Sequence, residues 1–67
     1  MPPLRVQLAG PHEAELWCGD ELLAVTVLYD GRMHLRIAER ADGRQWLIDA
    51  VALTLAVDDA ARRIGAY

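Results

Sequence analysis

The sequence predicts an α+β fold, in which an antiparallel five-stranded β-meander is followed by one C-terminal α-helix packed on one face of the sheet. Apolar and polar residues alternate through most of the first half, as in half-buried strands. Gly-Asp and Asp-Gly pairs separate these runs, as they do in tight hairpins. From Asp49 onward the apolar period becomes helical. A chain of 67 residues gives one domain over 1–67 with a small core.

The first hairpin is predicted by the alternation of Leu4, Val6 and Leu8 with Arg5 and Gln7. We expect residues 9–13 to form a five-residue loop. The resulting partners are Leu8 with Ala14, Val6 with Leu16, and Leu4 with Cys18. All these side chains would lie on one face of the sheet.

The second connection is Gly19-Asp20, which has glycine first, as a two-residue type II′ turn requires. This turn would pair Leu16 with Leu23 and Ala14 with Val25. The apolar face would continue into the third strand.

The third connection lies at Tyr29-Asp30-Gly31 and allows two registers. A two-residue Asp30-Gly31 turn would put Val27 opposite His34 and split the apolar set. A three-residue loop over 29–31 would instead give the pairs Val27 with Met33, Val25 with Leu35, and Leu23 with Ile37. Because burying each such side chain stabilises by roughly 1.5–3 kcal/mol, we predict the three-residue loop.

A fifth strand is expected after Ala41-Asp42-Gly43, with its register left open. A three-residue turn there would pair Ile37 with Leu47, and a two-residue turn would pair Ile37 with Ile48. The side of the sheet on which Trp46 lies depends on this choice.

The helix is predicted over residues 50–64, with Asp49 as its N-cap and Gly65 as its stop. Its apolar positions have helical spacing, and two Asp-Arg pairs are four residues apart. The apolar positions are Leu53, Val57, Ala60 and Ile64. The charged pairs are Asp58 with Arg62 and Asp59 with Arg63. The alternative is a strand over 51–57 followed by a shorter helix.

Composition excludes several kinds of chemistry. The chain has no serine and one cysteine, Cys18, so serine nucleophiles, intrachain disulfides and multi-cysteine metal sites are excluded. We expect no enzyme activity, no cofactor and no metal. No apolar run approaches the roughly 20 residues of a membrane span, and no signal sequence is evident, so we expect a cytoplasmic protein without a membrane partner. The absence of Ser, Asn, Lys and Phe is typical of a GC-rich bacterial genome.

The face opposite the helix is predicted to mix apolar and basic side chains. On the predicted register it carries Trp17, Leu22, Ala24, Thr26, Leu28, His34 and Arg36, with Arg5 beside Trp17. Apolar groups bordered by arginine are typical of protein contact surfaces, although isolated exposed apolar residues are common and arginine stems can cover rings. We therefore predict a protein-interaction module that self-associates through this face, as a homodimer, or that binds another protein partner there. The predicted contact residues are Trp17, Leu22, Leu28, Arg5, Arg36 and His34.

Two other functions remain as hypotheses. A stripe of Arg32, Arg36 and Arg40 near a tryptophan could bind single-stranded nucleic acid. The net charge of -3, the absence of lysine and the lack of an aromatic pair on adjacent strands disfavour this function. The third hypothesis is an accessory subunit of a larger enzyme or regulatory complex.

Overall fold

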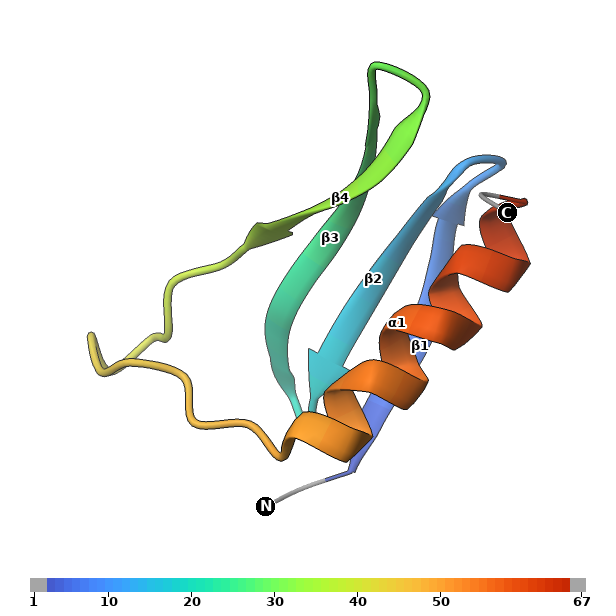
Figure 1. Cartoon of the computed structure of the whole chain (residues 1–67). Coiled ribbons are helices and arrows are strands. Elements are labelled where there is room, and N and C mark those ends of the chain that lie inside the picture. Colours follow the sequence, from blue (N-terminus) through green and yellow to red (C-terminus); the bar gives the residue numbers. More distant parts are fainter. Residues whose placement is uncertain (1–2, 66–67) are drawn as a thin grey trace.

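The protein is a four-stranded antiparallel sheet with one helix on one side (Figure 1), in a computed structural model that describes residues 3–65. The elements are β1 (Leu4–Gly10), β2 (Glu13–Cys18), β3 (Glu21–Tyr29), β4 (Arg32–Ile37) and α1 (Ala50–Ile64), and the strands lie in sequence order. The α+β class and the C-terminal helix are confirmed. The predicted fifth strand is wrong, because residues 38–49 lie outside the sheet.

The β1–β2 hairpin has the predicted register. Its pairs include Leu4 with Cys18, Val6 with Leu16, and Leu8 with Ala14. The connection is tighter than expected, because β1 continues to Gly10, which pairs with Glu13. The turn is therefore at residues 11–12, and the predicted five-residue loop is wrong.

A β-bulge in β3 changes the register of the β2–β3 pair. Gly19 has a φ of 61°, as the first central residue of a type II′ turn should. The ladder starts as expected, but Leu16 then pairs with Ala24 rather than with Leu23. Leu23 is thus the extra residue, and both Leu23 and Ala24 belong to the buried core. The predicted partners Leu16 with Leu23 and Ala14 with Val25 are wrong by one residue.

The β3–β4 turn has two residues, not the predicted three. Asp30 and Gly31 have φ values of 55° and 73°, the two positive angles of a type I′ turn. Val27 therefore pairs with His34, and Leu28 with Met33. For the apolar side chains of β2 and β4 to lie on the same face, the chain between them needs one residue more than a regular ladder with two-residue turns. That extra residue is Leu23 in the bulge, and not a third residue in the β3–β4 turn.

The two corrections exchange the faces of β3 from Ala24 onward. Ala24 and Thr26 are buried on the helix side, and Leu28 lies on that side opposite Met33, which packs against the core. Val25 and Val27 consequently point away from the helix, opposite to the prediction.

The helix covers only part of its side of the sheet. α1 lies over β1 and β2, while the β3–β4 hairpin extends beyond it (Figure 1). The buried apolar core is small and rich in alanine, and consists of Ala14, Leu16, Leu23, Ala24, Ala56, Ala60, Ala61 and Ile64. Leu28 and Ile37 remain 43% and 55% exposed, so the helix leaves part of this side open.

Both ends of α1 have the predicted caps. The Asp49 side chain accepts a hydrogen bond from the Ala52 N–H at 2.9 Å, and Gly65 is left-handed with a φ of 71°. Asp58 with Arg62 and Asp59 with Arg63 form ion pairs at 3.0 and 3.2 Å. The alternative strand over 51–57 is wrong.

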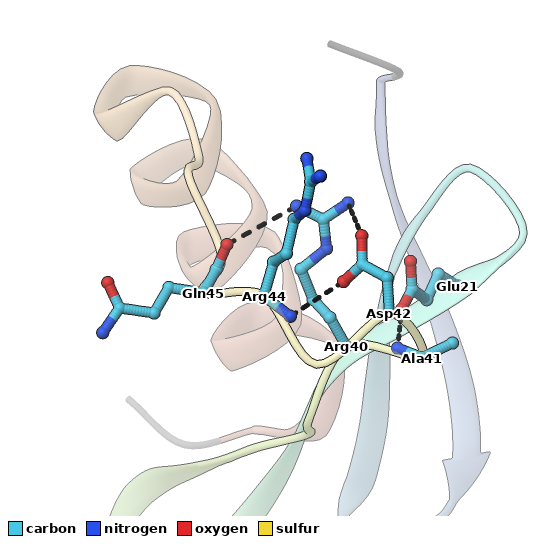
Figure 2. A network of polar contacts seen from close by, with 6 residues as sticks. All are labelled: Glu21, Arg40, Ala41, Asp42, Arg44 and Gln45. Carbon is cyan, nitrogen blue, oxygen red and sulfur yellow. Dashed lines mark hydrogen bonds and ion pairs between the residues drawn. The ribbon is translucent and has the colours of Figure 1, made fainter.

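The loop over 38–49 is held by polar side chains instead of a neighbouring strand (Figure 2). Glu21 accepts a hydrogen bond from the Ala41 N–H at 2.7 Å, and Asp42 accepts one from the Arg44 N–H at 2.9 Å. The Arg40 guanidinium lies 3.2 Å from Asp42 and 3.5 Å from the Gln45 carbonyl. These contacts satisfy backbone groups that a fifth strand would have paired.

Trp46 fixes the loop to the helix side of the sheet. Its indole N–H donates to the Ala38 carbonyl at 2.7 Å, and Arg40 lies over its ring at 5.4 Å. Trp46 and Ile48 both pack against the core. Trp46 therefore lies on the helix side of the sheet, although neither of the two predicted registers of a fifth strand forms.

Candidate protein-interaction surface

The side of the sheet away from α1, here called the outer face, carries one row of side chains from each strand. The β1 row is Arg5 and Gln7, the β2 row is Glu13, Glu15 and Trp17, the β3 row is Leu22, Val25, Val27 and Tyr29, and the β4 row is Arg32, His34 and Arg36. The helix covers none of these rows, because it packs on the other side.

The β3 row is apolar along its length. Leu22, Val25 and Val27 are half-buried by neighbouring strands, and Tyr29 at the hairpin end is exposed. The Leu23 bulge puts the β-branched Val25 and Val27 on this face in place of the predicted Ala24 and Thr26. The central strand therefore presents larger apolar side chains than the sequence prediction gave it.

Trp17 is held in place by its neighbours on the outer face. Its indole N–H donates to Glu15 at 3.2 Å, and the Arg5 guanidinium lies 5.5 Å from the ring centre. Arg5 in turn donates to Gln7 at 3.0 Å. The expectation that an arginine covers part of the ring is therefore correct for Arg5. A tryptophan fixed in this way loses little side-chain entropy when a partner binds.

The charges of the outer face are segregated by strand. One line of paired residues runs across the sheet from Gln7 through Glu15 and Val25 to Arg36. The β2 row is acidic at Glu13 and Glu15, and the β4 row is basic at Arg32 and Arg36. Neither arginine side chain forms an ion pair within residues 3–65.

The β4 row also contains His34. Its Nδ1 lies 3.0 Å from the Arg32 carbonyl oxygen, and the Tyr29 ring meets its ring edge-on at 5.6 Å between centres. These contacts order the hairpin end of the outer face.

A hollow of about 250 Å³ marks the place where β2 begins and β3 continues beyond it. Glu13, Val25, Val27 and Arg36 from the outer face line it together with Thr26 and Leu28 from the helix side. Acidic, apolar and basic side chains of three strands thus meet around one depression.

Five of the six predicted contact residues lie on the outer face: Arg5, Trp17, Leu22, His34 and Arg36. The sixth, Leu28, is on the helix side with Met33. Sequence reasoning missed Val25 and Val27, because it placed the extra residue in the wrong part of the chain. Arg40, predicted to extend the arginine stripe, belongs to the loop network around Trp46.

The helix side has apolar hollows of its own. One of about 480 Å³ follows α1 along Leu53, Thr54, Val57, Asp58 and Ala61. Another of about 360 Å³ lies between the helix and β1. Leu55, which is 65% exposed, projects from the same helix and provides a control position away from the outer face.

Residues with metal-ligating or nucleophilic groups are dispersed. No three of them come together in a metal-binding arrangement within residues 3–65. Cys18 is a half-buried free thiol on β2 opposite Leu4, and the His12 Nδ1 lies 3.4 Å from the Ile64 carbonyl oxygen. None of the helical segments between residues 3 and 65 has the length and hydropathy to span a bilayer.

Comparison of the chain with protein-family models, curated proteins and solved structures gives no match.

Proposed function

We propose that the chain is a small protein-interaction module that self-associates through its outer face. The observation that carries this proposal is the arrangement of three rows: an apolar β3 row lies between an acidic β2 row and a basic β4 row. A surface with both charges on opposite sides of an apolar centre is complementary to a copy of itself.

The size of the face predicts weak association. Four strands about 4.8 Å apart, each with about six residues at 3.3 Å, cover about 400 Å². Two such faces would bury on the order of 800 Å², less than the roughly 1,200–2,000 Å² of stable interfaces. We therefore expect a weak dimer whose population depends on concentration.

Binding of single-stranded nucleic acid is less well supported. Of the three arginines in that hypothesis, Arg40 is engaged by Asp42 and Trp46. The carboxylates of Glu13 and Glu15 also lie on the face that phosphates would approach, and they would repel them. A salt-dependent gel shift that Arg32→Ala with Arg36→Ala abolishes would favour nucleic acid over self-association.

Sedimentation velocity from about 5 µM to about 1 mM tests the proposal. We expect the wild type to shift toward a dimer as concentration rises. Val25→Arg should remain a monomer, because it places a charge at the centre of the apolar row. Leu55→Arg makes a comparable change on the exposed side of the helix and should dimerise as the wild type does.

Two outcomes would contradict self-association through this face. One is a wild type that stays monomeric over the whole concentration range. The other is a Val25→Arg variant, folded by circular dichroism, that dimerises as strongly as Leu55→Arg.

A further inference from the structure

We infer that the two copies meet face to face about a two-fold axis parallel to β3, so that Glu15 of each copy pairs with Arg36 of the other. This inference rests on the proposed function and specifies which residues make the surface select its own copy.

The two-fold axis must lie in the plane between the two sheets, and two of its orientations bring the sheets together in aligned packing. An axis across the strands would put β2 over β2 of the second copy, so that carboxylates would meet carboxylates. An axis along β3 puts β2 over β4 of the second copy and brings Glu13 and Glu15 to the basic row. Only the second orientation places opposite charges together.

The pairing of Glu15 with Arg36 follows from their common level in the sheet. Both are direct neighbours of Val25, on β2 and β4 respectively. With the axis passing along β3 at Val25, each residue lies one strand, about 4.8 Å, to the side of the axis. Aligned sheets are rotated by about 30° relative to each other. This rotation shifts Glu15 of one copy by only about 2.4 Å relative to Arg36 of the other, a distance that long side chains can span.

The apolar contact lies on the axis itself. Leu22, Val25 and Val27 of one copy would meet the same row of the other, and two equivalent Glu15–Arg36 pairs would border them. Such border charges determine partner choice and orientation more than they add affinity. Arg36 suits this role, since its side chain forms no ion pair within residues 3–65.

Reciprocal charge reversal tests the inference. Glu15→Arg alone would bring two guanidinium groups together at both contacts of the dimer, and Arg36→Glu alone would bring two carboxylates together. We expect each single variant to dimerise at least about tenfold more weakly than the wild type, a change of about 1.4 kcal/mol. An equimolar mixture of the two should form a heterodimer, because both contacts then join opposite charges.

Sedimentation velocity gives the readout, and the double variant Glu15→Arg with Arg36→Glu should dimerise as the wild type does. Glu39→Arg and Arg44→Glu change the net charge equally on the exposed loop and should have no effect, alone or mixed. If a reversal fails to fold, Glu15→Gln and Arg36→Gln replace it, and each should weaken the dimer by a smaller factor.

The inference is overturned if the folded single variants dimerise like the loop controls, or if their mixture remains monomeric. Such a result leaves self-association through the outer face standing, provided that Val25→Arg still abolishes the dimer. A wild type that is monomeric throughout overturns both.

Discussion

Thr26 shows how a single residue completes the sheet where two strands separate. It is 1% exposed, and its hydroxyl accepts a hydrogen bond from the Ala14 N–H at 2.8 Å. The β2–β3 ladder ends at the pair of Glu15 with Val25, so Ala14 has no ladder partner on β3. The Thr26 side chain therefore replaces a backbone acceptor, and β3 can continue beyond β2 without leaving a buried donor unpaired.

Replacement of this hydroxyl should destabilise the protein. Thr26→Val keeps the shape of the side chain but leaves the Ala14 N–H without its acceptor, so we expect a loss of about 1–3 kcal/mol in the free energy of unfolding. Thr26→Ser retains the acceptor and should lose less. Urea denaturation of the two variants and the wild type measures the differences, and a Val variant as stable as the wild type would show that the hydrogen bond contributes nothing.

At the scale of the element, β3 determines how far the fold follows from the sequence. Apolar alternation and turn residues correctly predict the first four strands, the β1–β2 register and the helix with both caps, but they also predict a fifth strand that the structure does not have. They also require one extra residue between the apolar rows of β2 and β4. They do not specify its position, because a bulge at Leu23 and a longer loop at 29–31 satisfy the same pattern on those two strands.

The same ambiguity in the position of the extra residue decides which residues of the candidate site the sequence places on the correct face. Trp17 and Arg36 lie on β2 and β4, whose faces are the same under either solution, so they were placed correctly. Val25 and Leu28 lie on β3 after the bulge, so they changed faces. The sequence predicts a turn and a strand over 38–49 and misses the loop, because hydrogen bonds to distant side chains, such as Glu21, leave no periodic signal.

The type I′ turn can be tested at Asp30, an exposed residue with a φ of 55°. Asparagine tolerates the left-handed conformation, whereas alanine is strained by about 1–2 kcal/mol. We therefore expect Asp30→Ala to lower the free energy of unfolding by about 1 kcal/mol and Asp30→Asn to change it by less than about 0.5 kcal/mol. Equal stability of the two in thermal and urea unfolding would argue against a positive φ at residue 30.

At the scale of the whole molecule, the core is too small to use all the apolar surface. Within the described residues, the only large apolar side chains of the buried core are Leu16, Leu23 and Ile64, and alanines supply the rest. The single helix lies over β1 and β2, so the other strands retain open apolar side chains on both sides. Domains of this size have a small free energy of unfolding. Burial of one such surface against a second chain would increase this free energy, because binding favours the folded state by mass action.

On the proposed function, the outer face binds a second copy of the same chain through its apolar and charged residues together. Intermolecular contacts in a mixture of isotope-labelled and unlabelled chains, measured by isotope-filtered NOE spectroscopy at about 1 mM, test this claim most directly. We predict contacts between the methyl groups of Val25 and Val27 of one copy and the same methyl groups of the other. Intermolecular contacts confined to helix-side residues such as Leu28, Leu53 or Leu55 would contradict the account.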